Sequence, residues 1–466
     1  MRARSAFVVA TAAGMLRSLG NASPAYAQDD EPETVAPPDT GVPGPRINYA
    51  ERPAIPHETK ACSMRVPVCV HASAAASGAV LAVLSSAERA WETLSGSLRL
   101  APPDVDPDDL AYHVYLVEGA AQRGITQLAA RDVRSRIDRG RAFTVLDANV
   151  RAGCQLDALV AREIARAVVY RLAPATAEGI ARAQTTYLAQ LIVPCATAFA
   201  IGEVQAFQSR PERAVADARA PEIGTSAEDG DGPSGGPFID GAFVFWARID
   251  WAYGRTPGAI VMASWALGAT TTDIGARRWH DEPDAFDILR ISFKNALSTG
   301  STIHDLLLDT AIARAFLGSA DDGLHQVELR TLGDAARVPL DWNLPWPAAP
   351  KRVAPRVPVQ PTGASYVIVN RAGAPPGARL RVEIVWEEHA LFRWAFVKLD
   401  AKGRELGRVA IPARERATEA QMTLVDLDGV DRIMLVGVNV GDPAYRFDPD
   451  DEVWEPHSWL LTLASE

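Results

Sequence analysis

The feature that most constrains the fold is a change of sequence pattern across a proline-rich stretch. Seven prolines lie within residues 339–361, a composition typical of a stiff interdomain linker. After them come seven short apolar runs, from SYVIVNR to SWLLTLAS, separated by Gly, Pro and Asp turns. Short strands at this spacing predict an all-β sandwich over residues 362–466.

Before the prolines, strand-like and helix-like patterns alternate. The runs SMRVPVCVHAS, LAYHVYLVEG and GRAFTVLDANV predict strands, and the alanine-rich run from Ala74 to Leu98 predicts a long helix. Three further helices are expected, over residues 157–173, 176–193 and 195–209. The expected fold class is therefore α+β: an α/β plus helical domain over residues 57–338, followed by the sandwich.

The N-terminus has the layout of a secretory signal. Arg2 and Arg4 precede an apolar run, and small residues close the segment, so we expect residues 1–27 to be a signal peptide. Residues 28–56 are rich in proline and acids and predict a disordered or extended leader. No later stretch reaches the ~20 apolar residues of a transmembrane segment. The mature protein is expected to be secreted or periplasmic.

The charge of the chain argues against one class of partner. The formal net charge is −11, and loss of the three arginines of residues 1–27, with no acid, gives −11 − 3 = −14. A chain this acidic is a poor match for nucleic acid.

The four cysteines predict two disulfides in an exported chain. Cys62 and Cys69 are close in sequence, whereas Cys154 and Cys195 flank a pair of expected helices. We therefore expect the pairs Cys62–Cys69 and Cys154–Cys195, although four cysteines allow three connectivities. Zinc binding is the alternative use, but the sequence has no CxxC pair.

The stretch LVAREIARAVVY, residues 159–170, has the spacing of the zinc-binding motif HExxH. In that motif two histidines bind zinc and the glutamate activates a metal-bound water. Here Arg162 and Arg166 stand in place of the histidines, and Glu163 keeps the position of the general base. At 100° per residue the apolar side chains form one core-facing stripe. Its members are Ala161, Ile164, Ala165, Val168 and Leu172.

The order of several short patterns resembles a known family. VCVHAS, SSAERAWETLSGSLRLAPP, YHVYLVEG, AFTVLDAN and LVAREIARAVVY follow one another over roughly residues 62–210. This order is similar to secreted zincin-type metalloproteases of myxobacteria and related bacteria, which carry an Ala-Trp pair like Ala90-Trp91 and then HExxH. The resemblance implies a zincin-like domain over residues 57–338, with zinc as the family's cofactor.

The same resemblance implies that the zinc ligands are lost here. In thermolysin-like and aminopeptidase-like sequences the third ligand is a glutamate roughly nineteen residues after the second histidine, which corresponds to Thr185. Arginine has no lone pair for a cation, so Arg162, Arg166 and Thr185 are degenerate ligand positions and zinc is predicted to be absent. We expect the arginines to pair with Glu163 and with an acid such as Glu178 or Glu203. The alternative is an ordinary amphipathic helix with a polar surface.

Three functions follow from these patterns. The first is a secreted metallopeptidase-like protein that has lost zinc binding and proteolysis and acts as a binding or scaffold protein. The second is an active secreted hydrolase with non-standard ligands, for which His71 and His280 are the histidines to test. The third is an envelope adhesion or carbohydrate-binding protein that acts through the sandwich. The partner would be an extracellular or envelope protein or polysaccharide, and the oligomeric state is open.

Overall fold

The computed structural model describes most of the chain after residue 43. The described residues are 44–120, 123–218, 236–268, 277–295, 302–325, 327–412, 417–442, 447–449 and 454–466. The expected signal peptide, residues 1–27, lies outside them. The described residues fall into two compact units, the first within Met1–Ala200 and Ile249–Ser298, the second within Ile201–Arg248 and Thr299–Glu466.

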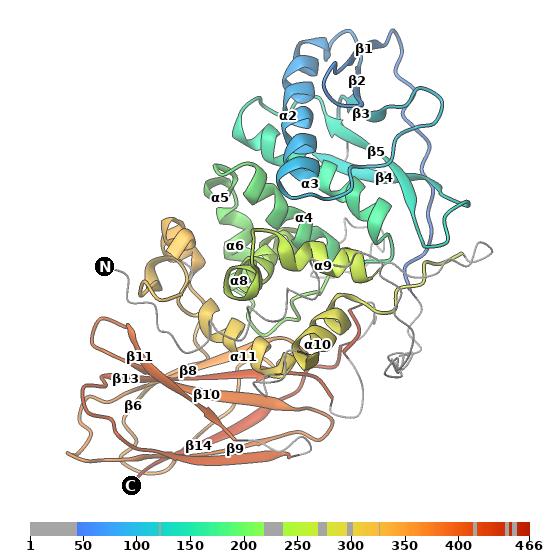
Figure 1. The fold of residues 1–466 in the computed structure, drawn as a ribbon. Coiled ribbons are helices and arrows are strands. Elements are labelled where there is room, and N and C mark those ends of the chain that lie inside the picture. Colours follow the sequence, from blue (N-terminus) through green and yellow to red (C-terminus); the bar gives the residue numbers. More distant parts are fainter. Residues whose placement is uncertain are drawn as a thin grey trace. The chain divides into compact units, whose positions relative to one another are not determined.

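A mixed five-stranded sheet is the centre of the first unit (Figure 1). Its strands are β1 (Thr59–Cys62), β2 (Val68–Ala72), β3 (Tyr112–Val117), β4 (Gly124–Arg131) and β5 (Gly140–Asp147). The order is β1-β2-β3-β5-β4, in which β2, β3 and β5 run parallel and the two edge strands run antiparallel to their neighbours. The three central strands are confirmed as predicted, whereas β1 and β4 were not anticipated from the sequence.

Helices cover one face of this sheet. The helices α2 (Val80–Glu92) and α3 (Cys154–Leu172) contact its strands. The same unit also contains α4 (Glu178–Ile192), α5 (Ala196–Phe199), α9 (Ala259–Leu267) and α10 (Ala285–Asn295). Helix α3 packs against α2, α4, β4 and β5. The opposite face of the sheet is covered in part by Ala50 and Ile55 from the segment before β1. That segment belongs to the expected leader and follows the sheet surface as extended chain.

Helix α3 begins three residues before residue 157, where Asp157, a good N-cap residue, had suggested its start. The residue before the helix is Gly153, whose φ of 112° allows the chain to turn from the sheet into the helix at Cys154. Asp157 lies in the first turn, where its carboxylate accepts a hydrogen bond of 2.9 Å from Arg89 on α2. The acid therefore joins two helices instead of capping one.

The second unit combines helices with two β-sheets. Its helices include α6 (Ile201–Gln208), α7 (Gly236–Gly241), the first part of α8 (Phe243–Tyr253) and α11 (Ile303–Arg314), with 3₁₀ segments at Gly318–Ala320 and Val327–Ala336. The single helix expected over residues 195–209 is two helices, α5 and α6, which belong to different units.

The two sheets of the second unit form a sandwich. The strands are β6 (Trp342–Pro345), β7 (Lys351–Val353), β8 (Ala364–Asn370), β9 (Leu380–Trp386), β10 (Phe392–Leu399), β11 (Glu405–Ile411), β12 (Glu419–Leu424), β13 (Arg432–Asn439) and β14 (Trp459–Ser465). The orders are β11-β10-β13-β8-β6 and β12-β9-β14-β7. Trp394 of one sheet meets Trp459 of the other edge to face, with ring centroids 5.2 Å apart. All seven predicted strands are present.

The range expected as a linker, residues 339–361, contributes two strands to the sandwich. β6 pairs with β8, and β7 pairs with β14. Each lies at the edge of its sheet. Prolines suit edge strands because the amide they lack would face solvent there, so a proline-rich composition did not prevent strand formation.

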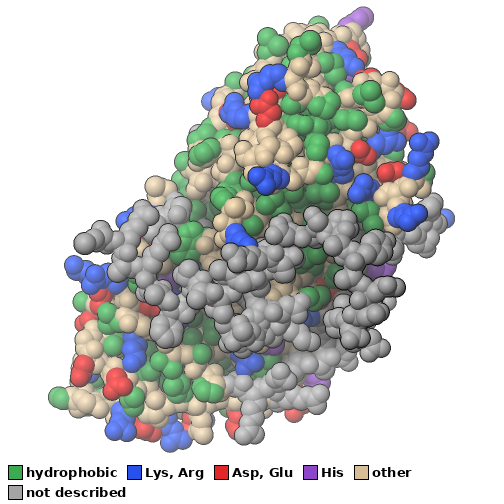
Figure 2. All heavy atoms as spheres, in the orientation of Figure 1, with side chains coloured by type: hydrophobic (Ala, Val, Ile, Leu, Met, Phe, Trp, Pro, Cys, Tyr) green, Lys and Arg blue, Asp and Glu red, His purple; other side chains and the backbone are tan. Residues whose placement is uncertain are grey.

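The surface of the described residues is mixed in charge. On the face drawn in Figure 2, basic and acidic side chains lie interspersed over the sandwich. Among the helices of the described ranges, none is both long and apolar enough to cross a membrane.

Candidate functional site

Helix α3 places the REIAR sequence at the centre of the first unit. Cys154 begins the helix and forms a disulfide with Cys195, 41 residues later. This bond ties the start of α3 to the segment that follows the end of α4. The other two cysteines, Cys62 and Cys69, are also disulfide-bonded. Both cysteine pairs are those expected from the sequence.

Glu163 points into the protein rather than toward solvent. It is 4% exposed, although it lies outside the apolar stripe that the helical projection gives for α3. Edge strand β4 covers it, because Gly124 at the start of β4 lets the strand approach closely. A Cβ at Gly124 would lie 3.2 Å from Cγ of Glu163 and 2.8 Å from Cδ1 of Leu159.

Both carboxylate oxygens of Glu163 accept hydrogen bonds. Oε1 accepts from Nε and Nη2 of Arg162, at 3.0 and 2.8 Å, and Oε2 accepts from Oγ1 of Thr126 on β4, at 2.9 Å. A charged acceptor that is buried in this way needs such donors, since desolvation would otherwise be costly. The position of the general base is therefore engaged in an ion pair.

A chain of hydroxyl groups continues behind Glu163. Thr126 lies 2.9 Å from the hydroxyl of Thr144 on β5, which lies 2.7 Å from the hydroxyl of Tyr112 on β3. Burial raises the pKa of Tyr112, so its hydroxyl stays protonated. The network joins three strands to α3 through groups that are all buried.

Arg166 reaches the neighbouring helix. Its Nη2 donates to the Glu178 carboxylate in the first turn of α4, and its guanidinium carbon lies 5.2 Å from the centre of the Tyr170 ring. Burial opposes the charge of Arg166, but Glu178, Tyr170 and Glu163 together outweigh it and raise the pKa of the guanidinium. Arg166 therefore keeps its positive charge and offers no lone pair.

The other positions expected at this site, Thr185 and Glu203, have different surroundings. Thr185 is 1% exposed, and its hydroxyl donates to Ala181 within its own helix at 2.8 Å. Glu203 belongs to α6 in the second unit, and Glu178 is the acid that pairs with Arg166. The residues at the three positions that the resemblance assigns to zinc ligands do not fit zinc, because two are cations and the third has no carboxylate.

One group of acids in the described ranges has the spacing of a metal site. Glu282, Asp284 and Asp287 lie at the start of α10 with carboxylate oxygens within 4.8 Å of one another. Asp284 accepts from the backbone of Asp287 at 2.8 Å, as a helix-capping residue does. The group therefore has a structural role at the helix start. His280, a candidate ligand from the sequence, donates its backbone amide to Asp138 at 3.1 Å.

The other histidine singled out, His71, has a different environment. It lies on β2, on the sheet face away from α2 and α3, and contacts His113 of β3. His113 was not anticipated, because it is 42 residues away in sequence. Its position facing the same side of the next strand is the signal that could have suggested it.

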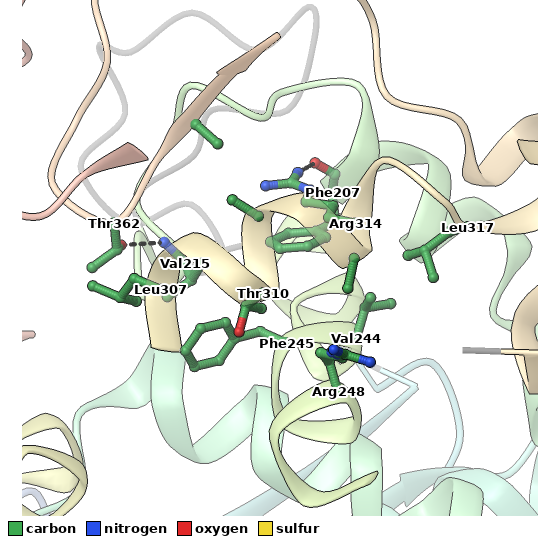
Figure 3. A pocket seen from close by; sticks show the side chains of 13 residues that line it. Phe207, Val215, Val244, Phe245, Arg248, Leu307, Thr310, Arg314, Leu317 and Thr362 are labelled. Atoms are coloured by element: carbon green, nitrogen blue, oxygen red, sulfur yellow. Dashed lines mark hydrogen bonds between the residues drawn. The ribbon is translucent and has the colours of Figure 1, made fainter. Parts of the chain in front are cut away.

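An apolar cavity lies in the second unit, between α8, α11 and neighbouring segments (Figure 3). Its volume is about 20 Å³, enough for about one water molecule. Arg314 at its wall donates from Nε to Gln208 at 2.7 Å and stacks 3.8 Å above the Phe207 ring. Burial lowers the pKa of Arg314 to about 10, so it remains a cation at neutral pH. We attribute this cavity to imperfect packing around a buried arginine.

The sequence matches no family model and no curated protein.

Proposed function

We propose that the protein is an exported, zincin-like protein that acts by binding or as a scaffold, without zinc-dependent proteolysis. The order of elements supports the zincin-like assignment: β2, α2 with Ala90-Trp91, β3, β4, β5, and then the helix that carries REIAR. Two disulfides support export, since such bonds persist in oxidising compartments.

The single observation that supports loss of proteolysis is the pairing of both arginines. Arg162 engages Glu163, and Arg166 engages Glu178 on the next helix. A general base has to be free to take a proton from water, and Glu163 is instead held by a cation and a hydroxyl. Ligands and base are therefore both unsuited to peptide hydrolysis. The function left to such a domain is recognition of an extracellular or envelope protein or polysaccharide.

A protease assay tests this proposal. The purified chain is incubated with fluorescent casein, with and without a chelator, beside the Glu163→Gln variant. We expect no cleavage above the buffer control and no difference between the variant and the parent. Cleavage that disappears with both the chelator and Glu163→Gln would overturn the proposal. Cleavage that survives both but is removed by a second purification step would come from a contaminating protease. Cleavage that stays with the purified chain would support an active hydrolase and would also overturn the proposal.

A further inference from the structure

A pair of buried histidines lies on the face of the first unit's sheet that is remote from α3. His71 and His113 are each 5% exposed, and Nε2 of His71 lies 2.8 Å from Nδ1 of His113. The ring of Tyr115 stacks on His71, with centroids 4.7 Å apart, and limits its rotation. The two nitrogens are therefore aimed at each other by the packing.

A carboxylate holds the other nitrogen of each ring. Glu58 contacts Nδ1 of His71, and Asp109 lies 3.1 Å from Nε2 of His113. The Cys62–Cys69 disulfide joins β1 to β2 and so fixes the segment that carries Glu58. Carboxylates that accept from the outer nitrogen of a histidine are the usual outer partners of metal-binding imidazoles.

Counting protons shows what the pair requires. Three nitrogen contacts need three N–H groups if each is a hydrogen bond, but two neutral imidazoles supply only two. When Glu58 and Asp109 each accept one, the inner nitrogens of His71 and His113 face each other with two lone pairs. Lone pairs at 2.8 Å repel unless a cation lies between them.

The cation could be a proton or a metal ion, and the surroundings favour the metal. Both rings are buried, and the outer nitrogen of each ring already contacts a carboxylate, so the inner nitrogens are the atoms left to bind a metal ion. Neutral imidazole is the form that binds metals. A cleft of about 380 Å³ leads to His113 and is lined also by Arg52 and Asp106. It offers an entry path and room for water ligands.

We propose that His71 and His113 form a two-histidine site for a late transition-metal ion such as Zn²⁺ or Cu²⁺, oriented by Glu58 and Asp109. With metal–nitrogen bonds of about 2.0–2.1 Å, tetrahedral binding sets the two nitrogens about 3.3 Å apart. The rings need to separate by about half an ångström from their present contact. Water from the cleft completes the coordination. The site is independent of the proposed function, because none of its residues lies on α3 or α4.

Copper and zinc titrations of the full chain, without an affinity tag and after chelator treatment, test the proposal. Zn²⁺ is titrated against a coloured chelator, and Cu²⁺ is followed by electron paramagnetic resonance. We expect one equivalent of each metal to bind and two imidazole nitrogens to couple to the copper. His71→Gln and His113→Gln should each abolish this binding.

Three further variants guard against effects on folding. Glu58→Gln changes a side chain that is 41% exposed, so the fold should survive, yet loss of its orienting role should weaken metal affinity by about 10- to 100-fold. His389→Gln, at a histidine whose side chain is 75% exposed, and Glu282→Gln, in the acid group on α10, should leave affinity unchanged. Absence of binding, or binding that Glu58→Gln leaves unchanged, would overturn the proposal. The metal titrations do not measure casein cleavage, so failure of the proposed metal site and failure of the proposed function can be distinguished.

Discussion

Replacing Glu163 by alanine should destabilise α3 far more than loss of an ordinary surface ion pair. Glu163 is buried, and its side chain accepts two hydrogen bonds from Arg162 and one from Thr126. Breaking a buried ion pair by removing one partner costs about 3–5 kcal/mol. The side chain of Arg162 is 26% exposed and can turn toward water, and Thr126 keeps Thr144 as a partner, so we expect about 2–3 kcal/mol.

Hydrogen exchange of the α3 peptide, measured by mass spectrometry, isolates this effect from unfolding of the second unit. A loss of about 2–3 kcal/mol corresponds to exchange about 30- to 140-fold faster for the protected amides. Glu92→Ala is the matched control, because the Arg65–Glu92 pair is solvent-exposed and worth at most about 1 kcal/mol. If the two variants accelerated exchange equally, Glu163 would not be an essential ion-pair partner and the argument from burial would be wrong.

Three other predictions concern stability. Trp394→Ala should lower the unfolding free energy of the sandwich by about 3–5 kcal/mol, measured by urea titration, because it leaves a cavity between the sheets. Burial disfavours protonation of His325, but the hydrogen bonds to Asp322 and Glu405 and the charges of these acids together outweigh burial and raise the pKa of His325. Protonated His325 therefore stabilises the folded chain fully below about pH 6.5, and this contribution to the unfolding free energy is lost as pH rises through the raised pKa. Melting temperatures from pH 6 to 9 should therefore fall more steeply for the parent than for His325→Gln. Reducing the disulfide that spans 41 residues should cost about 4 kcal/mol in the first unit by the chain-entropy estimate, seen as a lower melting temperature.

The sequence predicted the elements whose patterns are local. Continuous apolar runs identify the central strands of the first sheet and all seven main strands of the sandwich. Strand β4 was missed because its sequence GITQLAAR alternates weakly, and β1 because TKAC is short and polar. The prolines of residues 339–361 hid β6 and β7, since proline composition does not distinguish an edge strand from a linker.

The environment of the candidate site depends on contacts between distant residues. A helical projection places Glu163 outside the apolar stripe of α3, but β4 comes from a segment 37 residues earlier and covers it. Arg166 and Glu178 are close in sequence, and their pairing follows from the short connection between α3 and α4. The contact between His71 and His113 required the register of β2 and β3, which no local pattern contains.

Converting Arg162 and Arg166 to histidine tests the proposed loss of peptidase chemistry. The double variant gains two zinc-binding side chains, but it also removes the cation that neutralises the buried Glu163. Without metal it should therefore be less stable than the parent, and its α3 amides should exchange faster. Zinc would restore part of that stability, because a cation returns beside Glu163, yet affinity should be weak since Thr185 offers no third ligand.

The parent chain and the His71→Gln background serve as controls, so that zinc bound on the other face of the sheet is not counted. Casein cleavage by the double variant that disappears when Glu163 is also changed to Gln would show that another residue supplies the third ligand. Two arginines together match the charge of one zinc ion, but they are part of the chain, so a chelator cannot remove their charge. In the His71→Gln background, the stability of α3 should accordingly be insensitive to chelators, whereas that of a zinc-loaded double variant in the same background should fall when the metal is removed.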